Sequence, residues 1–484
     1  MTDPLDALAA QAQAQLDMLS YPARPWVVPR QHEGTEVLDV AIVGAGQSGM
    51  TIALGLMREN VTNIRLYERA LPGKAGPWRS FARMKTLRTP KHVSGPEMGI
   101  PALTPEAWYR ARFGDLAWAQ LGKIPREDWQ DYLDWLRDTV NPPIRHGVEV
   151  VDLEPLPGGI TAVRQRDAAG RETVDYARAV VLTPGIEATG AWAVPDFVRA
   201  ALPEPLFAHT ADDIDFAALK GKRVAVLGGG ASAFDNAAEA LEAGAQVDMF
   251  VRRPKLPPVN PYRWMEFTGF LRNFPDLDDA RKWAFMQRIF RMNQPPPQDT
   301  YNRCAVFGAF RIHYQSPFTD LHEAGGKIRI TTPKGRFDAD FLIVGTGMVV
   351  DFTARPELRR MAADIATWAD RHEPARGAGD YGLGSYPYLG DAFQFRGRTE
   401  ESDAMLARHY CYTFASMVSQ GCSAGISALK FGAERVVRGI TRQLFTEDAD
   451  AHLAALMAYD EPELRPEAAP VPDPALAGSS ETPV

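Results

Sequence analysis

The first stretch that could do chemistry is a glycine-rich turn, VAIVGAGQSG, which follows the apolar run at residues 38–43. Gly44 permits a tight turn, Gly46 leaves room for a pyrophosphate beside the backbone, and Gly49 lets a helix pack closely on the strand. The free N–H groups and the positive dipole end of that helix would face the phosphate. Glu68 ends the next apolar run, 19 residues past Gly49, where an acid binds ribose hydroxyls. The sequence therefore predicts a dinucleotide site formed by Gly44, Gly46, Gln47, Ser48, Gly49 and Glu68.

A second turn, VAVLGGGASA at residues 224–233, repeats this pattern with Ala233 in place of the third glycine, a tolerated variant. The strand that follows ends in Arg252 and Arg253, where the first copy ends in an acid. A glutamate would repel a 2′-phosphate, whereas arginine binds it through two parallel hydrogen bonds. The second copy therefore favours NADPH over NADH or FAD, although the two arginines could instead form a solvated edge. The predicted residues are Gly228, Gly230, Ser232, Ala233, Arg252 and Arg253.

Two dinucleotide sites in one chain have a simple chemical use. A nicotinamide delivers hydride to a flavin, the cofactors carry the chemistry, and the protein orients them. The first turn is therefore expected to hold FAD.

The elements that must position these turns are two strand–turn–helix–strand units, at residues 38–68 and 222–251. They predict an α/β fold with two Rossmann-like, three-layer dinucleotide-binding domains. The FAD domain is expected to be discontinuous, with the NADPH domain inserted in it, and residues 185–220 are interpreted as a linker. The predicted parts are an N-terminal helix and extended arm at 1–35, the FAD domain at 36–200 and 346–460, the NADPH domain at 201–345 with a helical insert at about 254–310, and a disordered tail at 461–484.

The composition excludes several other classes. The net charge of −8 over 484 residues predicts no nucleic-acid partner, and no apolar run is long enough to cross a membrane. The N-terminus lacks a signal peptide, and the three cysteines show neither CxxC nor zinc spacing. We therefore expect a cytoplasmic protein without a metal site, whose partners are a small-molecule substrate and O2. Homo-oligomerisation stays open.

Further segments carry a family resemblance. Gly76-Pro77-Trp78, FARMKTLRTPK at residues 81–91, LKGKRVAVLGGGASAFDNA at 219–237 and FLIVGTGM at 341–348 are similar to segments of the class B flavin monooxygenases. This group includes FMO-type enzymes, amine N-hydroxylases and Baeyer–Villiger enzymes. The resemblance implies that Trp78 lies beside the isoalloxazine ring of the flavin. It also implies that Gly345 and Gly347 belong to a cofactor-binding return strand, which leads the chain back to the FAD domain. It makes Lys91 and His209 the candidate catalytic residues.

The resemblance implies a reaction. NADPH reduces FAD, the reduced flavin captures O2, and the resulting C4a-(hydro)peroxyflavin inserts one oxygen atom into a small substrate. The FxGxxxH signature is matched only by His209, and Thr89-Pro90 replaces a threonine–asparagine pair, which argues against a Baeyer–Villiger enzyme and favours oxygenation at nitrogen or sulfur. The alternative is an NADPH-dependent flavoprotein reductase that passes electrons to a small molecule or a protein. A third reading is a redox-sensing flavoprotein.

Other residues allow two readings each. Arg88, Arg303 and His313 could bind a substrate carboxylate or lie on an ordinary surface. HYCYTF at residues 409–414 and SQGCSAG at 419–425 could face the flavin or pack in the core. The aromatic residues of the insert could line a pocket or form core, and they are Tyr262, Trp264, Phe267, Phe270, Phe274, Trp283, Phe285 and Phe290.

Overall fold

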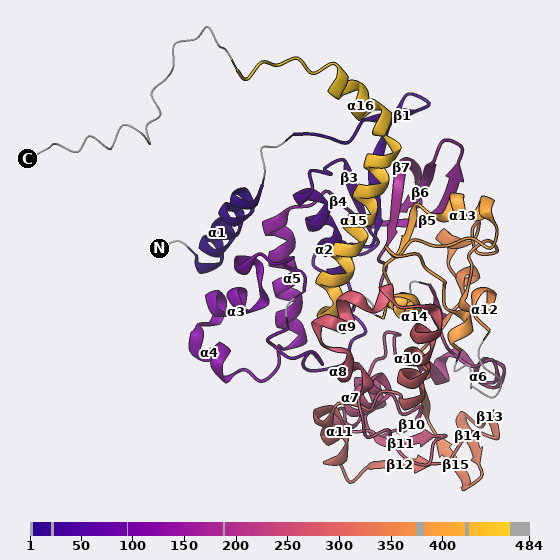
Figure 1. Cartoon of the computed structure of the whole chain (residues 1–484). Coiled ribbons are helices and arrows are strands. Elements are labelled where there is room, and N and C mark those ends of the chain that lie inside the picture. Colours follow the sequence, from indigo (N-terminus) through magenta and orange to yellow (C-terminus); the bar gives the residue numbers. More distant parts are fainter. Residues whose placement is uncertain are drawn as a thin grey trace, which may run out of the picture.

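The computed structural model describes residues 3–20, 24–93, 95–186, 189–373, 382–421 and 425–464. Its first unit is built on a sheet in the order β4-β3-β2-β7, which β6 and β5 extend on the far side of β7 (Figure 1). Strands β2, β3, β4, β7 and β18 run parallel, whereas β1, β5 and β6 add antiparallel pairs. The strands are β1 (Arg30–His32), β2 (Thr35–Val43), β3 (Ile64–Glu68), β4 (Ile144–His146), β5 (Val148–Leu156), β6 (Ile160–Asp167), β7 (Glu172–Leu182) and β18 (His409–Cys411).

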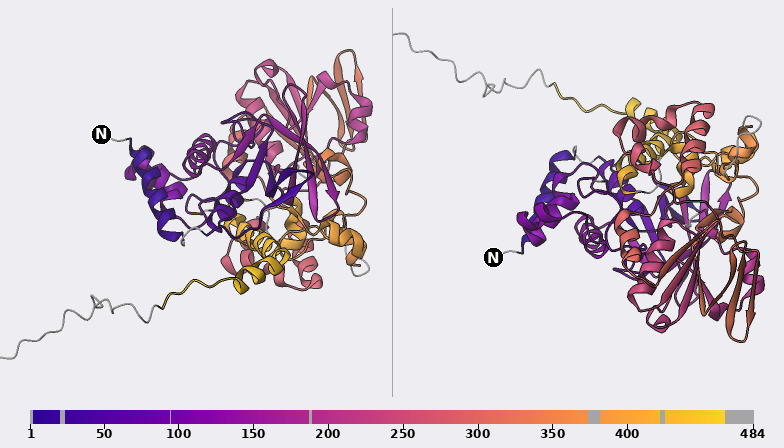
Figure 2. Two further views of the ribbon diagram at one scale, coloured as in Figure 1. Left: turned by 90° about the horizontal axis from the view of Figure 1, so that it is seen from above. Right: turned by 90° about the horizontal axis from the view of Figure 1, so that it is seen from below.

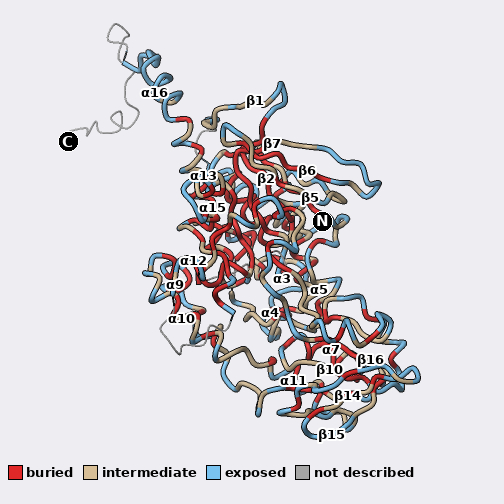
Figure 3. The backbone as a smooth tube through the Cα atoms, turned by 90° about the vertical axis from the view of Figure 1, so that its right-hand side faces the viewer, coloured by how far each residue is buried: buried red, intermediate tan, exposed pale blue. Residues whose placement is uncertain are grey.

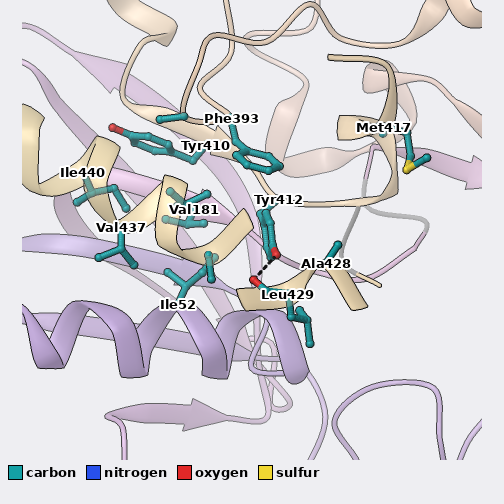
Figure 4. Packing of buried hydrophobic residues seen from close by; sticks show 14 of the residues in the cluster. Ile52, Val181, Phe393, Tyr410, Tyr412, Met417, Ala428, Leu429, Val437 and Ile440 are labelled. Atoms are coloured by element: carbon teal, nitrogen blue, oxygen red, sulfur yellow. Dashed lines mark hydrogen bonds between the residues drawn. The ribbon is translucent and has the colours of Figure 1, made fainter. Parts of the chain in front are cut away.

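One face of this sheet is covered by two long helices that pack against each other, α2 (Gln47–Arg58) and α15 (Leu429–Glu447). Ile52 of α2, Val181 of β7 and Val437 of α15 meet in the same core (Figure 4). The hydroxyl of Tyr412 donates to the carbonyl oxygen of Leu429 at 2.9 Å, which ties the start of α15 to the chain that follows β18. The apolar faces of α2 and α15 therefore fix α2 on the sheet, and with α2 the glycine turn that precedes it.

The second unit is a fully parallel sheet in the order β12-β11-β10-β16-β9. One face carries α7 and α11, and the other carries α6 and a three-stranded antiparallel sheet, so the third layer is not purely helical. The strands of the parallel sheet are β9 (Phe207–His209), β10 (Arg223–Leu227), β11 (Gln246–Val251), β12 (Phe310–Tyr314) and β16 (Phe341–Val344). The other elements are α6 (Asp196–Ala201), α7 (Ala231–Glu242), α11 (Gln298–Ala305), β13 (Asp320–Ala324), β14 (Lys327–Thr332) and β15 (Gly335–Ala339).

The chain passes between the units twice, through β8 (Gly190–Trp192) and β17 (Met348–Val350), which pair antiparallel. The first unit is thus discontinuous and the second is inserted in it, as the sequence predicts. The linker interpretation of residues 185–220 is wrong in part, because β8, α6 and β9 lie there and β9 completes the second sheet. Such three-residue strands carry too little periodicity to be recognised. The domain limits drawn from the sequence stay predictions.

Most of the helical insert packs on a different unit from the one that it follows in the sequence. It follows β11 of the second unit, yet Phe270, Phe274 and Trp283 are buried in the core of the first unit. Arg435 of α15 binds Asp276 in the insert at 2.9 Å. The insert is therefore a cover on the first unit. The helices of this cover are α8 (Pro261–Met265), α9 (Thr268–Asn273) and α10 (Asp279–Met292), whereas α11, at the end of the predicted insert, packs on α7 of the second unit.

The remaining helices lie around these layers, except that α14 (Met417–Gln420) is buried in the core of the first unit. Figure 2 shows the N-terminal helix α1 at one side of the molecule, where it packs on α3 and α5. Figure 3 shows that buried residues gather in two bodies, around β2 with α15 and around α7 with β10, whereas α16 is exposed. No helix in the described ranges is long and apolar enough to cross a membrane. Residues 465–484 of the predicted tail lie outside the described residues. These helices are α1 (Pro4–Leu19), α3 (Pro105–Phe113), α4 (Asp115–Gln120), α5 (Arg126–Val140), α12 (Trp368–Arg371), α13 (Glu400–Leu406), α14 (Met417–Gln420) and α16 (Ala449–Met457).

Candidate functional site

The first glycine turn lies at the carboxyl end of β2 and begins α2. Gly44 has φ of +100°, and a Cβ there would lie 2.6 Å from the carbonyl oxygen of Thr183. A Cβ on Gly49 would lie 2.0 Å from the carbonyl oxygen of Gly44, so helix and strand meet too closely for any side chain. A Cβ on Gly46 would meet no atom within 4 Å. The turn is thus tight on two sides and open at Gly46, which fits an approaching pyrophosphate.

Glu68 is buried at the end of β3, next to this turn. Its carboxylate accepts the N–H of Ala45 at 3.0 Å and the N–H of Ala70 at 2.8 Å. These bonds hold the side chain still and leave other lone pairs of the two oxygens for ribose hydroxyls. The residues of the first turn therefore fit FAD.

Trp78 is connected to the first turn through a residue that the sequence analysis missed. Its ring contacts that of Trp129 in α5 edge-on, with 6.3 Å between ring centroids. The indole N–H of Trp129 donates to Oε1 of Gln47 at 3.3 Å. Trp78 therefore lies one side chain away from the helix that begins at the glycine turn, which agrees with a place near the flavin.

The second glycine turn repeats this geometry at the carboxyl end of β10. Gly228 has φ of +123°, and a Cβ there would lie 2.3 Å from the carbonyl oxygen of Gly345. A Cβ on Gly345 would in turn lie 2.6 Å from the Cβ of Ala233, whereas one on Gly230 would meet no atom within 4 Å. Gly347, with φ of +82°, begins the return to the first unit. This turn is also open where a pyrophosphate would approach.

Arg252 and Arg253 follow β11 directly. Arg252 is exposed and Arg253 is half-buried, and burial together with the charge of Arg252 lowers the pKa of the Arg253 guanidinium. No hydrogen bond joins either side chain to a carboxylate in the described ranges. A bound phosphate would relieve the repulsion between the two charges.

The two candidate catalytic residues lie in different surroundings. Lys91 donates to the carbonyl oxygen of Trp118 in α4, and its ammonium lies 4.8 Å from the centre of that ring. His209 is buried at the end of β9, opposite Val344, which precedes Gly345. Its Nδ1 accepts the N–H of Ala211 at 3.2 Å. Lys91 is thus engaged with a peripheral helix, whereas His209 lies beside the second turn.

The three residues with a possible role in carboxylate binding already have carboxylate partners within the chain. Arg88 binds Asp235 at 2.7 Å, Arg303 binds Glu239 and Glu242 at 2.8 Å each, and His313 binds Asp248 at 2.7 Å. The segment 409–414 is largely buried beside β7, where it forms core. Residues 422–424 of SQGCSAG lie outside the described residues.

Most aromatic residues of the insert form core, and Trp283 also lines a pocket beside α12 together with Asp370 and His372. Phe270, Phe274 and Trp283 are buried, and Tyr262, Phe285 and Phe290 pack against the same core. Only Trp264 and Phe267 are largely exposed, at 57% and 48%. Within the described ranges, no group of three or more His, Cys, Asp or Glu residues could hold a metal ion.

Comparisons with known proteins agree with the two dinucleotide-binding turns described above. Residues 41–266 match the pyridine nucleotide-disulphide oxidoreductase family. The chain is 41% identical over 455 residues to an FAD-dependent urate hydroxylase from Xanthomonas campestris, covering 93% of this chain and 95% of that protein. The chain belongs to the class B flavin-dependent monooxygenases. It is therefore an NADPH-dependent FAD monooxygenase that acts on a small substrate.

Solved structures of this class share the fold. An ornithine hydroxylase from Pseudomonas aeruginosa aligns with a TM-score of 0.66 at 18% identity, over 84% of this chain and 100% of that one. An ornithine N-hydroxylase from Kutzneria, solved with reduced FAD, NADP⁺ and L-ornithine, aligns with a TM-score of 0.64 at 17% identity, over 84% of this chain and 99% of that one. At this identity the likeness concerns the fold.

Four residues that the sequence analysis missed support the site. Thr183 bonds the carbonyl oxygens of Val43 and Gly44 at 2.9 Å each, and the ring of Trp192 lies 5.1 Å from that of His209. These contacts join residues that are not neighbours in the chain, so no local sequence pattern predicts them. The four residues are Trp129, Thr183, Trp192 and Asp235.

Proposed function

We propose that this enzyme hydroxylates urate or a closely related oxidised purine, with NADPH as the reductant and O2 as the source of the oxygen atom. The observation that carries the proposal is the 41% identity to the urate hydroxylase over nearly the whole length of both chains. Likeness of this extent includes both turns, the insert and the return strand. The substrate is thus taken from the relative that matches the whole chain.

The cofactors are assigned by the two turns. FAD would be held by the α2 N-terminus and Glu68, and NADPH by the α7 N-terminus with Arg252 and Arg253. Bound FAD supplies the hydride acceptor and the reaction with O2. The cofactor-binding residues proposed are Gly44, Gly46, Gln47, Ser48, Gly49, Glu68, Trp78, Gly228, Gly230, Ser232, Ala233, Arg252, Arg253, Gly345 and Gly347.

The backbone and the side chains of this chain have three roles in that arrangement. The N–H groups of the turns bind phosphate oxygens, and the glycines let the phosphates reach them. Glu68 orients a ribose through its fixed carboxylate. Trp78, packed on Trp129, would cover the space beside a bound flavin and help to keep water out of it.

The three candidate residues for carboxylate binding give no support to an amino-acid substrate. An amino-acid hydroxylase must bind the carboxylate of its substrate. Arg88, Arg303 and His313 are already paired with acids of the chain. None of these three is available for that purpose, which agrees with a planar heterocyclic substrate.

The test measures NADPH oxidation, O2 uptake and H2O2 release together, with urate, xanthine, L-ornithine and L-lysine. Urate is expected to raise NADPH oxidation and to suppress H2O2, and ¹⁸O2 should label the product. Xanthine controls for purine shape without the last oxygen of urate. No stimulation by any purine would refute the urate proposal.

A second candidate substrate is an amine, oxygenated at nitrogen. It is favoured by the ornithine hydroxylases among the similar structures and by the sequence-based preference for nitrogen or sulfur. Formation of a hydroxylamine from L-ornithine or L-lysine, without effect of urate, would select it. NADPH oxidation without O2 uptake, supported by an artificial electron acceptor, would instead select a reductase.

A further inference from the structure

The acidic face of α7 forms a cluster of ion pairs that joins the two units. Asp235, Glu239 and Glu242 are spaced four and three residues apart, so they share one face of the helix. Three cations meet this face. We call the set the α7 ion-pair cluster, and its members are Asp235, Glu239, Glu242, Lys85, Arg88 and Arg303.

The central pair of the cluster is Arg88 with Asp235. Nη2 of Arg88 lies 2.7 Å from Oδ2 of Asp235, whose side chain is only 3% exposed. The other oxygen of Asp235 accepts the hydroxyl of Thr300 in α11 at 3.1 Å. Both carboxylate oxygens are therefore bonded, and the pair is held in one geometry.

The outer pairs differ in how exposed their cations are. Lys85 contacts Glu239 at 3.3 Å and Glu242 at 3.0 Å, and its side chain is 57% exposed. Arg303 comes from α11, which lies beside α7 (Figure 1), and binds the same two acids. The exposed Lys85 pairs are screened by salt and contribute little. Arg303 is only 16% exposed but joins α7 to α11 within the second unit, so Arg88 with Asp235 is the link between the units that has the most buried acid.

The segment that carries Lys85 and Arg88 is anchored in the first unit. The N–H of Leu87 donates to the carbonyl oxygen of Ile124 at 2.8 Å, and that of Arg126 donates to Lys85 at 3.1 Å. Leu87 itself is buried against α5 and its neighbours. Arg88 therefore reaches from a fixed part of the first unit to the helix that begins at the second glycine turn.

We propose that the Arg88–Asp235 pair is a positioning contact that sets where α7, and hence bound NADPH, lies relative to the flavin. The proposal rests on the proposed placement of NADPH at the second turn. Hydride transfer from the nicotinamide to the flavin needs the two reacting atoms within about 3–3.5 Å, and a shift of about 1 Å costs on the order of 100-fold in rate. Arg88 thus acts through α7.

The test is the rate constant of flavin reduction by NADPH, measured anaerobically by stopped flow in Arg88→Gln, Asp235→Asn and the double variant. In each single variant, NADPH is expected to reduce the flavin at least about tenfold more slowly than in the wild type. Because the two residues act as a pair, the double variant should match the singles instead of multiplying their effects. Reduction by dithionite and FAD content should stay near wild type, whereas the melting temperature should fall in the single variants, because each leaves one member of the pair without its partner.

Two variants serve as matched controls. Lys123→Gln removes another ion pair between the units, Lys123 with Asp299 at 3.0 Å, which is exposed and does not touch α7. Lys85→Gln removes the exposed pair of the cluster. Both should stay within about threefold of the wild-type rate. If Arg88→Gln fails to fold, Asp235→Asn alone tests the pair, and Arg88→Lys, which keeps the charge, should retain most of the wild-type rate.

The outcomes separate the two proposals. If NADPH does not reduce wild-type enzyme, the placement of NADPH fails. If wild type is reduced and the Arg88 and Asp235 variants are equally fast, the positioning role fails alone. The positioning role would also be overturned if the rate losses of the two single variants multiplied in the double variant, or if Lys123→Gln slowed flavin reduction equally.

Discussion

Gly46 and Gly49 stand three residues apart in one turn, yet the structure demands glycine for different reasons. At Gly49 a Cβ would collide with the backbone of Gly44 at 2.0 Å, whereas at Gly46 it would meet nothing within 4 Å. Gly49 is therefore required by the fold itself. At Gly46 the protein has room for a side chain, and only a bound pyrophosphate would exclude it.

Gly46→Val should give a folded but colourless protein. The added carbons occupy the space of the pyrophosphate at a cost of about 1–3 kcal/mol or more, which weakens FAD binding by roughly 10- to 100-fold. The 450 nm absorbance per chain and the melting temperature measure the two effects separately. Gly49→Ala should instead lower the melting temperature sharply. A yellow Gly46→Val protein would show that the site is misplaced.

Arg252 and Arg253 should decide the choice between NADPH and NADH. Loss of a charge-assisted contact to the 2′-phosphate costs about 1.5–3 kcal/mol, so the double change to alanine should raise KM for NADPH roughly 10- to 100-fold. KM for NADH should hardly change, because NADH lacks that phosphate. Steady-state kinetics with both cofactors checks this. Equal weakening of both would contradict the assignment.

At the scale of the elements, the insert is a structural cover of the first unit. Phe274 is 2% exposed, and its ring lies against Gly421, where a Cβ would come within 2.3 Å of the ring. The absence of a side chain at Gly421, which has φ of +64°, makes room for this ring. The insert therefore contributes to the stability of a unit that lies far from it in the chain.

Phe274→Ala should lower the free energy of unfolding by about 3–5 kcal/mol, because it leaves a cavity in a packed core. Denaturant unfolding followed by intrinsic fluorescence measures the change. Trp264→Ala is the matched control: it removes another aromatic ring of the insert, but one that is 57% exposed. That change should cost less than about 1 kcal/mol. Equal losses would mean that the insert is not anchored through Phe274.

At the scale of the whole molecule, a buried charge cluster ties distant parts of the chain together. Arg178 of β7 is fully buried and binds Asp448 after α15 at 2.8 Å, and Asp448 also binds Arg30 of β1 at 2.8 Å. Asp39 of β2 lies near this cluster. Burial raises the pKa of the Asp39 carboxyl from 3.8 to about 6, against the attraction of Arg178.

Stability should therefore depend on pH through Asp39. A raised pKa means that the native state binds the proton more tightly than the unfolded chain, so this stabilisation is complete below pH 4 and is lost as pH rises through about 6. Asp39→Asn should leave the melting temperature unchanged at pH 4. Above pH 7 it should add at most about 3 kcal/mol to the free energy of unfolding.

Asp448→Asn provides a control of opposite sign. Burial opposes ionisation of Asp448, but hydrogen bonds from Arg178 and Arg30 prevail and lower its pKa. Its stabilisation is therefore present at neutral pH and is lost on acidification. Asp448→Asn should destabilise at pH 7, where Asp39→Asn stabilises. Melting curves between pH 4 and 8 that move in the same direction for both variants would contradict this account.

The sequence by itself determined the parts of this protein that depend on near neighbours in the chain. The order of strand, glycine turn and helix predicted both Rossmann-like units, because each glycine answers a local demand for a tight turn or a close approach. Arg252 and Arg253 suggested NADPH from their place after one strand. The family resemblance, carried by short segments such as residues 341–348, predicted the monooxygenase class that the comparisons bear out.

The tertiary structure alone decided what depends on contacts across the chain. Nothing in the local sequence shows that the insert covers the first unit, that Trp129 joins Trp78 to Gln47, or that Arg88 pairs with Asp235, 147 residues away. Such contacts form because the apolar surface of the first unit must be covered and the acidic groups on α7 need cationic partners when they are buried. Which residues become partners depends on their positions in space, so spacing along the chain does not predict these contacts.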